Sequence, residues 1–242
     1  MPQTIFERAL EFVVDDSVIG LGSGRASHRF VELLGERVRA GLNVNGVPTS
    51  QSTADLARKV GIPLVELEPG LELALTVDGA DEVDPRLNLI KGYGRALVRE
   101  KVVAAASKQL VILVGNEKLV PALGARGRLP IEVVPFAVPL VLAKVAALGA
   151  AATVWTVEGR PAVSDNGNAI LDLTIANCTF AESRDPHAWE LALQAIPGVV
   201  GTGLFLGSAD VVLVGDDTSF VLGEELRRSA SGLKTSPAKG TI

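Results

Sequence analysis

Along the first half of the chain, segments with the hydrophobic pattern of a strand alternate with segments that have the pattern of a helix. Short runs rich in apolar residues, typical of buried strands, cover residues 17–22, 42–49, 71–81 and 109–115. Between them, apolar residues recur at helical spacing over residues 6–13, 27–41, 50–61 and 96–107. Strands that are apolar throughout are covered on both faces, so the pattern predicts an α/β fold with a Rossmann-like parallel sheet.

The pattern changes near residue 129, where prolines punctuate the chain. Helices are predicted over 139–150 and 185–198, and Asn166-Gly167 is typical of a hairpin turn. The apolar run 209–217 is expected to rejoin the first sheet. We therefore predict the following division: a Rossmann-like catalytic domain of residues 1–128 and 203–226, a smaller α+β domain of residues 129–202, and a loosely held tail, 227–242.

Composition narrows the function classes. The formal net charge is −5, whereas nucleic-acid-binding surfaces are usually basic. The single cysteine, Cys178, excludes an intramolecular disulfide and is expected to be a small buried apolar group. The longest uncharged run, residues 191–209, contains a proline and four glycines, which disfavours a spanning helix. We expect a cytoplasmic protein that binds neither nucleic acid nor membrane, without a zinc site.

A glycine-rich turn follows the first apolar run. Gly22, Ser23 and Gly24 lie between this run and a helix, an arrangement that can hold a phosphate. The dinucleotide fingerprint fails because its third glycine is Ser27, and no Gly-Lys-Ser/Thr completes a P-loop. A tight turn that binds nothing is an equally good reading of this loop alone. The hydroxyl residues of 49–53 are interpreted as turn and capping residues.

An acidic loop follows the third apolar run. Asp78, Asp81, Glu82 and Asp84 lie at the carboxyl end of a predicted strand, where α/β proteins bind ligands. Acids there can bind sugar hydroxyls, coordinate a metal or move protons. A solvated acidic turn is the alternative. Asp78 lies nearest the buried run, while Glu82 and Asp84 are expected to be surface charges.

A lysine loop completes the set. Lys91 precedes Gly92 and Gly94, and can place its ammonium near a developing oxyanion. Glu100, on the helix that follows, either reaches into a cleft or pairs with a base on the helix surface. Lys118 follows another buried strand, and an exposed lysine is its default interpretation. In a parallel sheet these loops fall on one edge, so their side chains can converge.

The stretches "GLGSG", "VDGADEVD", "LIKGYGRALVREK" and "LPIEVVPF", in this order, resemble the type A ribose-5-phosphate isomerase family. The resemblance extends from about residue 9 to residue 222. It implies an aldose–ketose isomerisation between ribose 5-phosphate and ribulose 5-phosphate through an enediolate. It further implies no cofactor and no metal, a phosphosugar substrate, and a homodimer or homotetramer with the small domain near the subunit contacts.

The resemblance also implies roles for individual residues. Glu100 matches the general base, and Lys91 the lysine near the reacting oxygens. Asp78 and Asp81 match the acids at the sugar hydroxyls, where we assign ring opening to Asp78 and proton transfer between the oxygens to Asp81. Further positions match substrate contacts: Ser23, Gly24, Arg25 and Ala26 of the phosphate loop, and Gly79, Ala80, Gly92, Tyr93, Gly94 and Lys118.

Two stretches depart from the family pattern. The usual phosphate loop is similar to Gly-Thr-Gly-Ser-Thr, and here Arg25 and Ala26 replace two hydroxyl residues. We expect Arg25 to supply a guanidinium–phosphate contact in their place. Relatives place a lysine in the first helix, where this chain offers Arg8. Tyr93 and Arg95 interrupt the usual glycine run and could shift specificity toward another pentose phosphate.

Two other function classes remain as alternatives. A sugar-phosphate sensor without turnover would normally carry a DNA-binding domain ahead of this one, and the acidic balance disfavours it. An NAD-dependent dehydrogenase is disfavoured by the failed fingerprint. Both the pentose phosphate route and carbon fixation stay open as the pathway.

Overall fold

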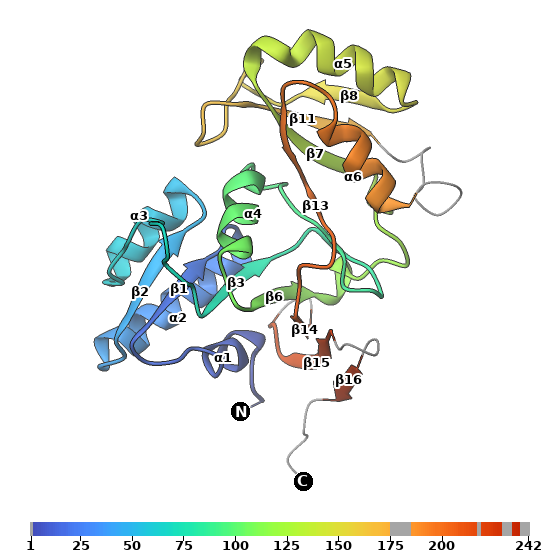
Figure 1. Ribbon diagram of the computed structural model, residues 1–242. Helices are drawn as coiled ribbons and strands as arrows, with labels where there is room; N and C mark the ends of the chain where they lie inside the picture. The colour runs from blue at the N-terminus through green and yellow to red at the C-terminus, as the bar shows by residue number, and fades with distance from the viewer. Residues whose placement is uncertain (1, 175–184, 217–218, 229–233, 238–242) are drawn as a thin grey trace. The chain divides into compact units, whose positions relative to one another are not determined.

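The computed structural model describes residues 2–174, 185–216, 219–228 and 234–237, shown in colour in Figure 1. Cys178 lies outside the described residues. The described chain falls into two compact units. The first comprises Met1–Ala80, Arg99–Leu119 and Gly207–Ile242, and the second comprises Asp81–Val98 and Val120–Leu206.

The first unit contains a seven-stranded sheet with the order β16-β15-β14-β6-β3-β1-β2 (Figure 1). The five strands from β14 to β2 are parallel, and β15 and β16 pair antiparallel at one edge. The predicted α/β class is thus confirmed, with a mixed sheet in place of a wholly parallel one. The strands are β1 (Ser17–Leu21), β2 (Val44–Pro48), β3 (Leu75–Gly79), β6 (Leu110–Gly115), β14 (Val211–Gly215), β15 (Leu222–Arg227) and β16 (Lys234–Pro237).

The helices of this unit are close to the predicted ones. They are α1 (Ile5–Leu10), α2 (Arg25–Arg39), α3 (Gln51–Val60), α4 (Leu97–Ala105), whose first two residues belong to the second unit, and the short 3-10 helix η1 (Asn116–Lys118). Local sequence explains their ends. The Glu7 N–H donates to Thr4 Oγ1 (3.2 Å) in a capping box at the start of α1, and Gly61 ends α3 with φ +86°.

Helices cover both faces of the sheet because side chains alternate along each strand. Ile19 and Leu21 of β1 join the core cluster that includes Phe30 of α2 and residues of α1 and α3. The intervening Gly20 faces the other side, where a Cβ atom would lie 2.6 Å from Val103 of α4. A glycine at this position lets α4 pack closely on the sheet.

The second unit is built on an antiparallel sheet with the order β12-β7-β11-β8. Its helices α5 and α6 contribute Val141 and Trp189 to a core shared with Ile131 and Leu171 of the sheet. The elements are β4 (Glu82–Val83), β5 (Leu89–Ile90), β7 (Arg128–Val133), η2 (Pro135–Ala137), α5 (Val138–Ala147), β8 (Ala151–Val154), β9 (Thr156–Val157), β10 (Arg160–Pro161), β11 (Ala169–Thr174), α6 (Pro186–Gln194), β12 (Val199–Thr202) and β13 (Leu204–Phe205).

The unit boundaries differ from the sequence-based division. Residues 81–98 and 120–128 lie in the second unit, because β5 pairs with β13 and the Val120 N–H donates to Val83 O (2.9 Å). At the other end of the chain, residues 234–237 of the predicted loose tail pair with β15 as strand β16. Strand β14 does join the first sheet, parallel to β6, as expected.

The predicted turn at Asn166-Gly167 is built around a buried carboxylate. Glu132 of β7 is fully buried, and its Oε1 accepts hydrogen bonds from Ser164 Oγ (2.9 Å), Asn166 Nδ2 (3.0 Å) and Asn168 Nδ2 (2.9 Å). Three donors on one oxygen compensate part of the cost of burying the charge. The polar residues of this stretch therefore fix the turn to β7.

Candidate active site

In the first unit, Asp78 holds the glycine loop against the end of β3. It is 1% exposed, and its Oδ1 accepts hydrogen bonds from the Ser23 N–H (3.1 Å), the Ser27 hydroxyl (3.0 Å) and the Gly79 N–H (2.7 Å). A Cβ at Gly22 would lie 2.2 Å from the same oxygen, so only glycine fits there. Asp78 is thus no solvated turn residue. The sequence signal that singled it out was its position beside an apolar run.

A cluster of hydroxyl groups surrounds Ser23. Its Oγ lies 2.7 Å from both Thr49 Oγ1 and Ser50 Oγ, and 3.2 Å from Thr53 Oγ1, which is in turn 3.1 Å from His28 Nε2. Sequence reasoning treated the residues of 49–53 as turn and capping residues. Ser50 is indeed the N-cap of α3, but it also brings the N-terminus of α3 to the loop that opens α2. Two helix N-termini and several hydroxyls together suit an anion.

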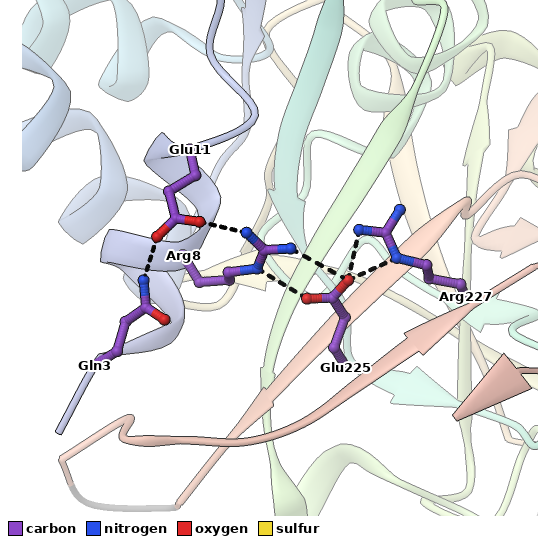
Figure 2. A network of polar contacts seen from close by, with 5 residues as sticks. All are labelled: Gln3, Arg8, Glu11, Glu225 and Arg227. Atoms are coloured by element: carbon purple, nitrogen blue, oxygen red, sulfur yellow. Dashed lines mark hydrogen bonds and ion pairs between the residues drawn. The ribbon is translucent and has the colours of Figure 1, made fainter. Parts of the chain in front are cut away.

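The cations expected near this loop have other contacts. Arg25, at the start of α2, is exposed, and its guanidinium carbon lies 5.4 Å from the centre of the Phe220 ring. Arg8 donates from Nε to Glu225 Oε2 (2.8 Å) and also pairs with Glu11 (Figure 2). Arg8 therefore joins α1 to β15. It takes the place in the first helix at which we expected relatives to carry a lysine near the phosphate.

Glu100 lies in the first turn of α4 and is 4% exposed. The interpretation of Glu100 as a surface helix residue is therefore wrong. A carboxyl group that is buried in this way is suited to abstract a proton, because water does not compete for it. Lys118, the last residue of η1, is partly buried just after β6, so it is not fully exposed.

In the second unit, Lys91 follows β5 and is 3% exposed. Its N–H donates to Gly203 O (2.8 Å), and its Nζ lies 5.5 Å from the centre of the Phe205 ring. Gly92 has φ +105°, and a Cβ there would lie 2.9 Å from Leu97 Cβ. The glycine therefore allows a sharp turn between the lysine and the start of α4.

Asp81 is joined directly to this lysine loop. Its N–H donates to Ile90 O (2.8 Å), and its Oδ2 accepts a hydrogen bond from the Tyr93 N–H (2.9 Å). Gly79, the last residue of β3, and Ala80 precede Asp81, and Gly94 is exposed. The acid predicted to transfer the proton and the predicted lysine loop are thus held together within one unit.

The expectation that Glu82 and Asp84 are surface charges is wrong. Glu82 is fully buried, and it accepts hydrogen bonds from the Gly124 N–H (2.6 Å) and the Arg126 N–H (2.7 Å). Burial raises the pKa of Glu82, and these backbone donors offset part of the rise. Asp84 is partly buried and accepts the Asn88 N–H (2.8 Å). Both carboxylates hold loops in place. The donors to Glu82 lie more than 40 positions away, and the Asn88 donor to Asp84 lies four positions away, so neither carboxylate belongs to a recognisable sequence motif.

Within the described residues, no group of three or more His, Cys, Asp or Glu side chains is arranged to hold a metal ion. None of the helices in this part of the chain is both long and apolar enough to cross a membrane. A loop suited to an anion beside a buried acid at a strand end, both in the first unit, is typical of α/β proteins that bind small phosphorylated ligands.

Comparison with known proteins defines the class further. Residues 45–219 match the family model described as ribose 5-phosphate isomerase A (phosphoriboisomerase A). Ribose-5-phosphate isomerase A of Parvibaculum lavamentivorans is 44% identical over 217 residues, covering 87% of this chain and 91% of the relative. That of Nitrobacter hamburgensis is 47% identical over 216 residues, covering 86% and 90%. This chain belongs to the ribose 5-phosphate isomerase A family.

Solved structures agree with this assignment. Ribose 5-phosphate isomerase A from Methanocaldococcus jannaschii superposes with a TM-score of 0.81 at 34% identity, covering 97% of both chains. A D-ribose-5-phosphate isomerase in complex with phospho-erythronic acid has a TM-score of 0.81 at 36% identity, covering 96% of both chains. The fold of this chain is therefore that of the family over nearly its whole length.

Proposed function

We propose that this protein interconverts ribose 5-phosphate and ribulose 5-phosphate in the cytoplasm. The observation that carries the proposal is the buried carboxyl of Glu100, in a chain that matches the isomerase family over residues 45–219. A related structure, 36% identical, is a complex with phospho-erythronic acid, a phosphorylated sugar acid. A phosphorylated pentose of similar length suits the same kind of site.

The chemistry needs a base, an acid and a cation. Glu100 removes the proton from C2 of the open-chain aldose and returns it to C1, so the carboxylate is regenerated. Asp81 passes the hydroxyl proton from O2 to O1, and Asp78 assists ring opening. As the aldehyde carbon is reduced, its neighbour is oxidised, so no external redox partner is consumed. Negative charge develops on the two oxygens in the enediolate, and the Lys91 ammonium stabilises it.

The phosphate is bound by the loop from Ser23 to Ala26. Its backbone N–H groups and the neighbouring hydroxyls provide donors, and fixing the remote phosphate orients the reacting carbons. Arg25 reaches the phosphate by leaving the Phe220 ring, a contact worth only about 0.5–1 kcal/mol at an exposed site. Lys118, with Gly79, Ala80, Gly92, Tyr93 and Gly94, completes the proposed substrate contacts. A raised KM for Arg25→Ala supports this role, whereas an unchanged KM contradicts it.

We also propose that the protein acts as a homodimer or homotetramer. Phe136 is 96% exposed, and Val134 and Leu140, close to it in the sequence, are 41% and 44% exposed. Exposed apolar side chains on the second unit suit contact with another copy of the chain. Light scattering at several protein concentrations measures the mass, and a monomer throughout contradicts this proposal.

A coupled assay for ribulose 5-phosphate, without nicotinamide cofactor or added metal, tests the activity. Glu100→Gln keeps the shape of the side chain but removes the base, so kcat falls about a thousandfold while KM changes little. The matched control is Glu36→Gln, an exposed glutamate of α2, which keeps the wild-type kcat. Substantial turnover by Glu100→Gln contradicts the assignment of the base.

A further inference from the structure

Five side chains of the second unit form a continuous cluster beside the lysine loop. The Arg95 cluster consists of Tyr93, Arg95, Arg128, Trp155 and Asp172. Asp172 Oδ1 accepts from Arg95 Nη1 (2.7 Å), and its Oδ2 lies 3.7 Å from Arg128 Nη1. The Arg95 guanidinium carbon lies 5.1 Å from the centre of the Trp155 ring, and that of Arg128 lies 3.8 Å from the centre of the Tyr93 ring. Both loop residues are thereby held to strands β7 and β11.

Arg95 occupies a backbone conformation that ordinarily favours glycine. Its φ is +69°, which costs a non-glycine residue about 1 kcal/mol. The side chains of Arg95 and Asp172 are each 15% exposed, so their ion pair is shielded from solvent far more than a typical surface pair. The contacts of the guanidinium thus compensate for a backbone conformation that the arginine does not favour.

The conformation of this turn determines where one N–H group points. The Arg95 N–H donates to Gly92 O (2.9 Å), which closes the turn, and the Tyr93 N–H inside the turn donates to Asp81 Oδ2 (2.9 Å). If Arg95 were released, the turn could open, and the hydrogen bond that orients the Asp81 carboxylate would weaken. The ion pair on β11 is therefore coupled to Asp81 through two backbone hydrogen bonds.

Tyr93 is not suited to proton transfer itself. Burial, together with the charges of Glu82 and Asp81, raises the pKa of Tyr93 to about 12, so the phenol stays protonated at neutral pH. Its hydroxyl donates to the backbone oxygen of Arg128 (3.1 Å). The side chain therefore anchors the loop to β7, and its contribution to the reaction comes from its backbone N–H.

We propose that Arg95 and Asp172 are positioning residues: their ion pair holds the turn from Gly92 to Arg95 so that the Tyr93 N–H orients Asp81 for proton transfer. The proposal rests on the proposed isomerase function and deepens it. It differs from the expectation that Tyr93 and Arg95 change the choice of sugar, because the two side chains are engaged with β7 and β11.

Arg95→Gly is the most informative variant. It removes the ion pair but suits the positive φ, so the relief of backbone strain offsets the lost contact and the unfolding midpoint stays near the wild-type value. A misplacement of about 1 Å can cost a hundredfold in rate, so kcat is expected to fall at least about tenfold, with KM changed less than about threefold. Arg58→Ala, which removes an exposed ion pair of α3, is the matched control and keeps the wild-type kcat.

Two further variants separate positioning from stability. Asp172→Asn keeps the size of the side chain and lowers kcat by a similar factor, and the double variant Arg95→Gly/Asp172→Asn is no slower than the slower single variant. Arg95→Lys recovers part of the lost kcat, because an ammonium can pair with the same carboxylate. If Arg95→Gly does not fold, Asp172→Asn decides the question by itself.

The outcomes distinguish this inference from the function on which it rests. A wild-type protein without ribose 5-phosphate turnover contradicts the proposed function. An active wild-type protein whose folded Arg95→Gly or Asp172→Asn variant keeps full kcat overturns the positioning role. Independent, multiplicative losses in the double variant also overturn it, because coupled residues act on one step.

Discussion

Two clusters in this molecule hold one carboxylate between two arginines beside an aromatic ring. In the first unit, the Glu225 cluster comprises Arg8, Phe12, Glu225 and Arg227, with Arg8 and Arg227 guanidinium carbons 4.9 Å and 5.4 Å from the centre of the Phe12 ring (Figure 2 shows the charged members). In the second unit, the Arg95 cluster places Asp172 between Arg95 and Arg128. The chemistry of the two is nearly the same.

What differs is the chain to which each cluster is attached. Arg8 and Glu225 are 217 positions apart, and their ion pair joins helix α1 to strand β15. Arg95 lies in a turn four positions after Lys91, one that also contacts Asp81. The first cluster is therefore expected to affect stability alone, whereas the second is expected to affect turnover as well. Similar side-chain contacts are thus expected to have different roles because they hold different segments of the backbone.

The largest expected effect on stability is that of Glu225→Ala. Removing the carboxylate leaves the Arg8 and Arg227 guanidinium groups near each other without it, and the free energy of unfolding falls by about 2 kcal/mol. Urea denaturation measures this change, and the coupled assay is expected to give the wild-type kcat at a temperature where the variant is folded. A large loss of kcat in the folded variant would contradict the expectation that the Glu225 cluster affects stability alone.

The pH dependence of stability tests the structural role of the Glu225 cluster. Burial acts to raise the pKa of Glu225, but hydrogen bonds from Arg8 and Arg227 outweigh it, and the pKa lies below the ordinary 4.5. The stabilisation is thus fully present above pH 4.5 and is lost as the pH falls through the lowered value. Glu82, with its raised pKa, acts in the opposite direction.

The measurement is urea denaturation of the wild type and of Glu225→Gln across the acid range. Because Glu82 is present in both proteins, the difference between their stability curves isolates Glu225. This difference is expected to shrink as the pH falls below 4.5. A difference that stays constant with pH would show that the arginines do not favour the charged form of Glu225.

A smaller effect is expected from Trp155→Leu in the Arg95 cluster. The change removes the ring beside the Arg95 guanidinium, a contact worth about 0.5–1 kcal/mol, while Asp172 still holds the arginine. We expect kcat to fall by about twofold to fivefold with KM unchanged. Steady-state kinetics test this, and a rise in KM alone would indicate that the ring affects substrate binding.

The smallest effect is expected from Arg58→Ala. Arg58 Nη1 lies 2.9 Å from Asp55 Oδ1, but the two side chains are 60% and 66% exposed. Such a pair contributes about 0.5 kcal/mol or less, and this contribution decreases further in high salt. Unfolding curves at low and high salt provide the check. A loss of unfolding free energy as large as that of Glu225→Ala would mean that the difference in burial does not explain the different contributions of the two ion pairs.

Much of the first sheet could be predicted because its strands carry their own signal. The apolar runs that contain β1, β3, β6 and β14 are buried on both faces, so composition alone marks them. Strand β15, with the sequence LGEELR, has no such run, because it lies near the sheet edge and its Glu225 serves the ion pairs. The mixed character of the sheet was missed for this reason.

The candidate site was predictable where a residue follows a strand, and less so where its partners are distant. Asp78 was singled out by its place at the carboxyl end of β3. Glu82 was mistaken for a surface charge because its donors, the Gly124 and Arg126 N–H groups, lie more than 40 positions away. The hydroxyls near Ser23 were read as local capping residues for the same reason. Long-range hydrogen bonds leave little trace in a single sequence.

We propose that Glu100 removes the proton from C2 of ribose 5-phosphate. Exchange of the C2 hydrogen with solvent in heavy water, followed by proton NMR, measures this step directly and separately from product release. We expect the wild type and Glu36→Gln to exchange at the same rate, and Glu100→Gln to exchange about a thousandfold more slowly. Exchange by folded Glu100→Gln at the wild-type rate would contradict it.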